Sequence, residues 1–413
     1  MRFARNEVRG VLISCLCASL ALAIGCGGGS NNSNSNNNGT PTQNTQPIAV
    51  NGGPAAAIAL SGIYPNGAFT SVTVCVPGSA TSCQTIDGIL VDTGSEGLRL
   101  LSSSSGGELN LSLPSTSIGG SPIGECIQFV DTSFLWGPVR TADIKIAGEQ
   151  ASSVPVQVVG DTSFPAVPSS CSTGGIDDDT LAILGANGIL GVGNFQQDCG
   201  SFCSTGAPPT GFYYQCNVSG CVPTLVSLTQ QVQNPVGLFA ADNNGVIVEL
   251  PAVNSPQPSV TGSMIFGIGT QADNALGSAT VFPIDSSGGF TTTYNNVAYS
   301  GSFIDSGSNG LFFLDASTAG IPICTDTSFW YCPASTTQFN VTNQATGGSP
   351  HALSFSVGNF DQLIAGSNAA INGTAGPNPG TFDFGLPFFY GRNVYTSIEG
   401  TTAPGGQTPY WAY

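Results

Sequence analysis

Two short stretches of this sequence are nearly the same, although they lie in different halves of the chain. Residues 89–95 read ILVDTGS, and residues 302–308 read SFIDSGS. In each stretch an apolar run typical of a β-strand stops at an Asp, which is followed by a small hydroxyl residue, a Gly and a Ser. The two acids, Asp92 and Asp305, can be brought face to face, and a facing pair of carboxyl groups can perform acid–base hydrolysis.

Each of these motifs has a second matching piece far downstream. Residues 187–193 read NGILGVG, and residues 382–389 read FDFGLPFF. In both halves an apolar strand therefore meets a Gly well after the Asp. The repeated unit is a spaced pair of segments, which is more specific than a tripeptide that any turn could contain.

Scarce residue types exclude several kinds of chemistry. The 413 residues include one His, His351, and one Lys, Lys145. A Ser–His–Asp or Cys–His hydrolase would have to use His351, which lies in a loop rich in Gly, Ser and Pro, and a zinc site built from several His cannot form. A Schiff-base enzyme would have to use Lys145, which alternates with apolar residues as on the solvent face of a strand. Chemistry by carboxyl groups remains.

The composition favours a mostly β protein. The 56 Gly and 27 Pro residues divide the chain into short elements, and the periodic stretches are rich in Val, Ile, Thr and Phe. We expect strands at residues 56–60, 70–76, 85–91, 127–129, 139–146 and 154–159, and in a second half at residues 238–240, 245–250, 263–268, 279–282, 291–294, 302–304, 354–357 and 392–399. Residues 223–234 have apolar positions at roughly helical spacing and are the best helix candidate, which would connect the two halves.

Charge is scarce and mostly negative. Seven Lys and Arg residues oppose 24 Asp and Glu residues, and the formal net charge is −17 at pH 7. Nucleic acid is not an expected partner, because phosphate binding needs clustered cations. The negative charge suits either a protein that works in acid, where many carboxyl groups are neutral, or a protein that is kept soluble by its charge.

The first residues resemble a bacterial lipoprotein signal. Three Arg residues precede an apolar stretch at residues 11–24, which is too short to span a membrane comfortably. It ends in AIGC, which predicts a signal peptide at residues 1–26 and a lipid on Cys26; ordinary cleavage without a lipid is the alternative. Residues 27–47, which carry no charge, predict a flexible tether. We expect an outer-membrane lipoprotein or a periplasmic protein of a Gram-negative bacterium.

Ten Cys residues follow Cys26, and they predict disulfides because their number is even in a chain that we expect to be exported. Close spacing suggests the pairs Cys75–Cys83, Cys199–Cys203, Cys216–Cys221 and Cys324–Cys332, which leaves Cys126–Cys171. The alternative for the four middle Cys residues is a metal site, since their spacing comes near that of a zinc ribbon. The acidic residues 177–179 suggest either a solvated loop or a calcium site.

The two motifs and their downstream partners resemble the pepsin-like aspartic peptidases. Residues 92–95 and 305–308 resemble the two active-site loops of that family. Residues 188–191 and 384–389 resemble the strands that cross these loops, and residues 262–267, GSMIFG, resemble a strand and turn early in the second lobe. The chain also resembles a group of exported bacterial proteins of unknown function that carry pepsin-like DTGS and DSGS motifs.

This resemblance spans about residues 56–400 and implies an all-β, bilobal fold. The fold would be a pepsin-like double β-barrel with the active-site cleft between its lobes. We expect an N-terminal β lobe at residues 48–234 and a C-terminal β lobe at residues 235–413, after the signal peptide and tether.

The resemblance also implies a mechanism. Asp92 and Asp305 would be the catalytic residues: they share one proton, hold a water between them and hydrolyse polypeptides. The residues that would support this dyad are Thr93, Gly94, Ser95, Ser306, Gly307 and Ser308. The Gly residues allow a tight turn, Thr93 and Ser306 can bond across the lobes, and the last Ser of each motif can orient a carboxylate oxygen. No cofactor or metal is needed, and we expect a monomer.

The cover of the cleft departs from the family pattern. Where this chain has Arg99, the family commonly has a Trp that supports a Tyr on a mobile flap. The flap is expected near residues 129–139, which contain Phe129, Phe134 and Trp136 but no Tyr. We expect these aromatic residues and Arg99 to form the flap and bind substrate. Arg99 could stack on Trp136, lie near the dyad, or lie on the surface with only its stem packed.

This departure motivates a second hypothesis from another class of function. The chain would then be a non-catalytic lipoprotein of the pepsin fold that binds a peptide or a glycan. The presence of both Asp92 and Asp305 argues for the peptidase, because a cleft that only binds has no need of two acids.

Overall fold

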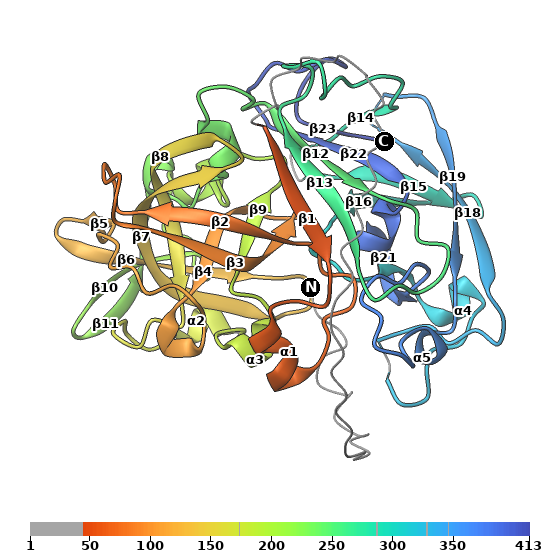
Figure 1. Ribbon diagram of the computed structural model, residues 1–413, viewed down its shortest axis with the longest axis horizontal. Helices are drawn as coiled ribbons and strands as arrows, with labels where there is room; N and C mark the ends of the chain where they lie inside the picture. The colour runs from red at the N-terminus through yellow and green to blue at the C-terminus, as the bar shows by residue number, and fades with distance from the viewer. Residues whose placement is uncertain (1–43, 173, 286–287, 328, 346) are drawn as a thin grey trace, which may run out of the picture.

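The computed structural model describes residues 44–172, 174–285, 288–327, 329–345 and 347–413, and most of its elements are β-strands (Figure 1). The strands of the first half are β1 Thr45–Val50, β2 Phe69–Cys75, β3 Cys83–Asp92, β4 Glu96–Leu101, β5 Ser117–Ile118, β6 Ser121–Gln128, β7 Phe134–Ile146, β8 Glu149–Val159, β9 Gly188–Val192, β10 Tyr213–Asn217 and β11 Gly220–Pro223. Those of the second half are β12 Gly245–Leu250, β13 Val260–Phe266, β14 Val281–Pro283, β15 Phe290–Tyr294, β16 Val297–Ile304, β17 Leu311–Leu314, β18 Thr337–Gln344, β19 His351–Val357, β20 Ala375–Gly376, β21 Asn378–Phe384, β22 Arg392–Ser397 and β23 Tyr410–Ala412.

The helices of the described residues are short. They are α1 Ala55–Ser61, α2 Ser169–Ser172, α3 Leu181–Leu184, α4 Ala316–Ala319 and α5 Phe360–Leu363, with 3-10 turns at Ser103–Ser105, Gly200–Cys203, Leu228–Gln230, Pro235–Leu238 and Leu386–Phe389. No helix in the described ranges is long and apolar enough to cross a membrane. The expected signal peptide, Cys26 and most of the expected tether lie outside the described residues.

The two halves repeat one arrangement of strands. In the first half β9 runs parallel to β3 and antiparallel to β4; in the second half β21 runs parallel to β16 and antiparallel to β17. The strand that leads into each Asp is thus flanked by the distant strand with the matching Gly. This duplication confirms the predicted all-β, bilobal fold, in which two barrel-like sheets lie side by side (Figure 1).

Strand β1 joins the lobes. It pairs antiparallel with β13 of the second half through six residue pairs and with β2 of the first half through one pair. Its side chains Ile48 and Val50 are buried in a core that continues across both halves. The last three residues of the expected tether, 45–47, therefore belong to β1.

Three expected elements are wrong. Residues 56–60 form helix α1 instead of a strand, because a run with three Ala residues favours a helix and Pro54 precedes it. Residues 238–240 belong to a 3-10 turn and the loop after it. Residues 223–234 hold only a short 3-10 turn at Leu228–Gln230, since the buried Val226 and Val232 and the exposed Leu228 do not share one face.

The five predicted disulfides are confirmed. The structure pairs Cys75–Cys83, Cys126–Cys171, Cys199–Cys203, Cys216–Cys221 and Cys324–Cys332. The alternative of a zinc site at the four middle Cys residues is therefore wrong, because a thiolate that forms a disulfide cannot ligate the metal. The five bonds are compatible with an exported protein.

Candidate active site

The two Asp-containing loops begin at equivalent ends of β3 and β16. Asp92 is the last residue of β3 and lies opposite Gly191 of β9. Asp305 follows the last residue of β16, and its backbone N–H donates to the carbonyl of Phe384 at the end of β21. Strand pairing thus fixes where each chain turns, and it presents both carboxyl groups where the two lobes meet.

The loops are bonded to each other across the lobes. The backbone N–H of Thr93 donates to Ser306 Oγ at 3.1 Å, and the backbone N–H of Ser306 donates to Thr93 Oγ1 at 2.9 Å. The two hydroxyls then donate onward to backbone carbonyls of the opposite lobe: Thr93 Oγ1 to Ile304 at 3.3 Å and Ser306 Oγ to Val91 at 2.8 Å. These four reciprocal bonds hold the lobes in one register at this point.

Each carboxylate is oriented within its own loop. Asp92 Oδ1 accepts from the Gly94 N–H at 2.8 Å, and Asp92 Oδ2 accepts from Ser95 Oγ at 2.6 Å. Asp305 repeats the pattern, with Oδ1 accepting from the Gly307 N–H at 2.7 Å and Oδ2 accepting from Ser308 Oγ at 2.8 Å. Two donors per carboxylate fix both side chains without a metal.

The two Gly residues are needed because the opposite Asp is so close. A Cβ atom on Gly94 would lie 2.7 Å from Asp305 Oδ1, and one on Gly307 would lie 2.6 Å from Asp92 Oδ1. Each lobe therefore presses its turn against the acid of the other lobe. The carboxyl groups of Asp92 and Asp305 are themselves close enough to share a hydrogen bond.

Burial sets the charge of this pair. Asp92 is 5% exposed and Asp305 is fully buried. Burial, followed by the negative charges of Asp92 and Asp383, raises the pKa of Asp305 well above its ordinary value. Asp305 therefore keeps a proton under conditions in which an ordinary Asp has lost it, as one member of a facing pair must.

A third acid, Asp383, belongs to the same cluster and was missed in the sequence. Its Oδ2 atom lies 2.7 Å from Ser308 Oγ, the hydroxyl that also contacts Asp305. Burial raises the pKa of Asp383 to about 7. The signal was present, since an acid inside the apolar run FDFG is unexpected in a buried strand.

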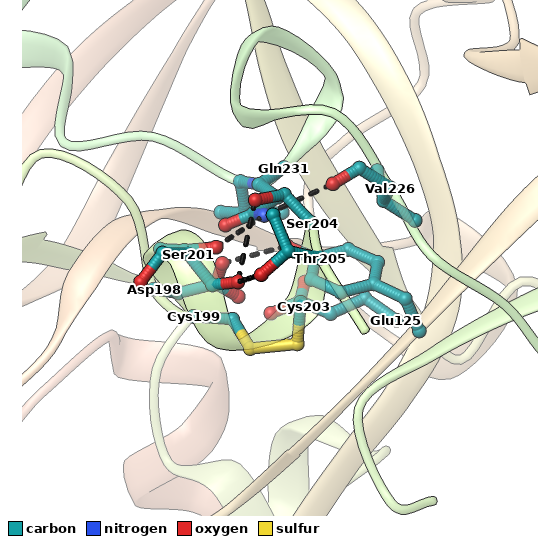
Figure 2. The surroundings of a disulfide bond; sticks show 12 residues. Glu125, Asp198, Cys199, Ser201, Cys203, Ser204, Thr205, Val226 and Gln231 are labelled. Atoms are coloured by element: carbon teal, nitrogen blue, oxygen red, sulfur yellow. Dashed lines mark hydrogen bonds between the residues drawn. A yellow bond between two sulfur atoms is a disulfide. The ribbon is translucent and has the colours of Figure 1, made fainter. Parts of the chain in front are cut away.

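Arg99 lies in a buried ionic network. Its Nη2 atom is 2.6 Å from Glu125 Oε1 on β6 and 3.3 Å from Asp198 Oδ2, while Nη1 donates to the Glu96 carbonyl at 2.6 Å. Figure 2 shows Glu125 and Asp198 among the residues around the Cys199–Cys203 disulfide. Arg99 has no exposed surface, so it cannot contact substrate as expected. Its side chain instead connects β4 with β6 through Glu125 and with the loop after β9 through Asp198.

The segment expected to be a flap is the hairpin of β6 and β7. Phe134 and Trp136 are buried in a cluster with the Cys126–Cys171 disulfide and Tyr214, and Trp136 Nε1 donates to the Pro165 carbonyl at 3.0 Å. Phe134 and Trp136 are therefore not placed to bind substrate directly. Arg99 does not stack on Trp136 and does not lie on the surface, which were two of the expectations for it. Phe129 is half-buried and packs against the core of the first lobe.

A pocket of about 670 Å³ is lined by residues of both halves. From the first half they include Phe195, Asp198 and Phe202, and from the second half Ile284, Asp285 and Glu399. The backbone N–H of Phe195 donates to Glu96 Oε1 at 3.2 Å, and Glu96 directly follows Ser95. None of the described lining residues belongs to the Asp92 or the Asp305 loop, so the link between this pocket and the first loop runs through Phe195 and Glu96.

A metal centre finds little support among the described residues. The one group of three possible ligands whose atoms lie near one another is Cys324, Cys332 and Asp361, and both Cys residues form a disulfide. The acidic residues 177–179 do not form such a group. The dyad, in contrast, can exchange protons with a water and a carbonyl group without any metal.

Of the comparisons with known proteins, the one with solved structures bears on the fold. Residues 40–413 match the model of a family described as "Protein of unknown function (DUF3443)". The structure is similar to that of an aspartic proteinase from Irpex lacteus, with a TM-score of 0.51 and 14% identity over 89% of this chain and 96% of that one. No curated protein sequence matches the chain. At this identity the similarity shows the pepsin-like fold alone.

Proposed function

We propose that this chain, which belongs to the DUF3443 family of proteins of unknown function, is an exported aspartic endopeptidase with Asp92 and Asp305 as its catalytic residues. The observation that carries the proposal is the pair of half-sites, each with a carboxylate that accepts from one Gly N–H and one Ser hydroxyl. The reciprocal bonds of Thr93 and Ser306 support it, because they keep the two carboxyl groups facing each other.

The reaction follows from the proton that the pair shares. Asp305, whose pKa is raised, holds the proton before the reaction, and Asp92 acts as general base on a water held between the two groups. As the water attacks the peptide carbonyl, Asp92 takes a water proton and Asp305 donates its own to the carbonyl oxygen. The tetrahedral intermediate collapses when the proton on Asp92 passes to the leaving nitrogen and Asp305 takes back a proton from one hydroxyl of the intermediate, which releases an amine and a carboxylic acid and restores both groups.

The substrate class is an extended polypeptide. The pocket lined by both halves offers the apolar Phe195, Phe202 and Ile284 together with acidic Asp285 and Glu399, and Phe195 contacts Glu96, which follows the Asp92 loop. Apolar or basic side chains of a polypeptide suit such a lining, because a basic group would find opposite charge there. Of the four residues expected to bind substrate at the flap, only the half-buried Phe129 remains in the proposal, at the edge of the substrate site.

Export and anchoring are part of the proposal. The signal-like residues 1–26 and the Cys-containing AIGC sequence support a lipid on Cys26 and a position at the outer membrane or in the periplasm of a Gram-negative bacterium. The five disulfides are compatible with such an oxidising compartment. We propose a monomer that needs no cofactor and has no nucleic-acid partner.

The proposal is tested by incubating the purified chain with an unfolded polypeptide from about pH 3 to pH 7 and measuring new termini by mass spectrometry. We expect cleavage in acid that is lost, by on the order of a thousand-fold, in Asp92→Asn. Cleavage that persists in this variant would exclude the peptidase mechanism.

The alternative, a protein that binds a peptide or glycan without turnover, is favoured by one observation. The hairpin expected to move over the cleft is fastened by Cys126–Cys171 and by the Arg99–Glu125 ion pair. In the same incubation, this alternative predicts capture of intact ligand with equal affinity by the wild type and by Asp92→Asn.

A further inference from the structure

The second half-site contains an acid that the first half-site lacks. Asp383 lies on β21 opposite Phe303, two residues before Gly385; the corresponding residue on β9 is Ile189, which lies opposite Leu90 two residues before Gly191. Asp383 is 4% exposed and Ile189 is 5% exposed, so both side chains point into the protein. The two half-sites share their carboxylates, their Gly residues and the last Ser of each motif, and at this strand position the second has an acid where the first has an apolar residue.

The contacts of Ser308 require a proton on a carboxyl group. Ser308 Oγ lies 2.8 Å from Asp305 Oδ2 and 2.7 Å from Asp383 Oδ2. A hydroxyl group has a single hydrogen, so it can donate to only one of these oxygens. The other short contact must be a hydrogen bond in which a protonated carboxyl group donates to Ser308 Oγ. In the first half-site, Ser95 Oγ meets Asp92 Oδ2 at 2.6 Å and Ile189 supplies no second acid.

Asp383 is the better carrier of this second proton. Its Oδ1 atom is buried and has no hydrogen-bond partner among the described residues, which costs much less for a neutral acid than for a carboxylate. The acids that face it are Asp305 and Asp92, and both would repel a negative charge. On the flanking strands, Tyr299 of β16 packs on Phe382, and β17 supplies only the apolar residues of LFFL. Burial accordingly raises the pKa of Asp383 to about 7.

We infer that Asp383 is a positioning residue that, while protonated, donates to Ser308 Oγ and thereby directs the Ser308 hydrogen to Asp305 Oδ2. The inference rests on the proposed function for its catalytic consequence. When Asp383 loses its proton, its carboxylate competes with Asp305 for the single Ser308 hydrogen and adds a third negative charge to the dyad. The catalytic site is then disabled as the pH rises through about 7.

The test compares the pH dependence of kcat/KM in the wild type, Asp383→Asn and Asp383→Ile. An Asn amide can donate to Ser308 at every pH. In Asp383→Asn the decline of kcat/KM on the alkaline side should therefore move upward by about one pH unit. Near pH 8 this variant should then keep about ten-fold more of its kcat/KM in acid than the wild type keeps of its own. Asp383→Ile copies the first half-site; it should also lose the decline near pH 7 but have a lower kcat with little change in KM. Profiles that superimpose on the wild type, or loss of all activity in Asp383→Asn, would overturn the inference.

A second measurement does not depend on catalysis. The pKa of Asp383 is raised in the folded chain, so folding takes up a proton between about pH 4 and pH 7, and stability is lost as the pH rises through this window. The urea midpoint of the wild type relative to Asp383→Asn should therefore fall between pH 4 and pH 8. If the difference between the two urea midpoints stays constant with pH, Asp383 is not protonated as inferred, even if the chain cleaves polypeptides. If the difference falls but no cleavage is found, only the peptidase proposal is refuted.

Discussion

Arg99 shows how one side chain can replace the support expected for a flap. Glu125 and Asp198 both reach its guanidinium in the interior, and Tyr213 donates from its hydroxyl to Asp198 Oδ1 at 2.7 Å. Burial, together with the charge of Glu125, raises the pKa of Asp198 well above its ordinary value. One cation thus keeps two buried acids in contact, and one of these acids holds a proton.

Replacing Arg99 by Met should therefore destabilise the chain by about 3–5 kcal/mol near neutral pH, because Glu125 and Asp198 would remain buried without a cation. Urea unfolding near neutral pH measures the loss. Arg140→Met is the matched control: its partner is Asp161 at 3.0 Å and both side chains are about one-fifth exposed, so the loss should stay within about 1 kcal/mol. Equal losses in the two variants would contradict the buried network.

The active-site residues differ in how far the sequence predicts them. Asp92 and Asp305 stand in repeated motifs, and each motif carries the turn residues that its local geometry needs, so the sequence indicates their place. The partners of Arg99 lie 26 and 99 residues away in the chain, and no local pattern connects them. Asp383 is visible in the sequence as an acid within an apolar run. Its role depends on the contact with Ser308, which is 75 residues away and is brought close only by the fold.

At the scale of elements, the β6–β7 hairpin is held from several sides. Cys126 of β6 is bonded to Cys171 of α2, the Phe134 backbone bonds to the segment around Asp177, and β6 also pairs with β10. At its tip Val130 is 61% exposed. From these attachments we expect the hairpin to open less widely than a flap held only at its base.

Removing the Cys126–Cys171 bond by a double change to Ser should cost about 4 kcal/mol, since the bond closes a loop of 45 residues. It should also make the hairpin tip sensitive to a protease of known specificity. The matched control is Cys75→Ser with Cys83→Ser, which opens a loop of 8 residues and should cost about 2.5 kcal/mol without exposing the tip. Thermal unfolding and limited proteolysis of both variants check this. If the tip stays protected without the bond, the disulfide is not what fastens the hairpin.

Short apolar runs explain where element prediction failed. Residues 56–60 and 238–240 are both too short for periodicity to separate a strand from a helix or turn. The longer apolar run of β12, rich in β-branched residues, was predicted with its observed bounds at Gly245–Leu250. In residues 223–234 Val226 and Val232 are buried in one cluster whereas Leu228 is exposed, so the helical spacing of the apolar positions did not correspond to a helix.

At the scale of the whole molecule, the two lobes are similar units joined by shared strands. β1 lies between β2 of one lobe and β13 of the other, and the cross-lobe bonds of Thr93 and Ser306 lie at the contact of the two Asp loops (Figure 1). Neither lobe has a complete site, because each supplies one carboxylate and presses one Gly against the acid of the other. Function therefore depends on the register of the lobes.

The central claim is that Asp92 and Asp305 act as one proton-sharing unit, and the most direct test is kcat/KM for polypeptide cleavage by Asp92→Asn, Asp305→Asn and the double variant. Groups that act as a unit are strongly non-additive. We predict that each single change and the double change reduce kcat/KM to the same residual level, on the order of a thousand-fold or more below the wild type. Independent losses that multiply in the double variant, or a single variant that keeps the wild-type rate, would contradict the account.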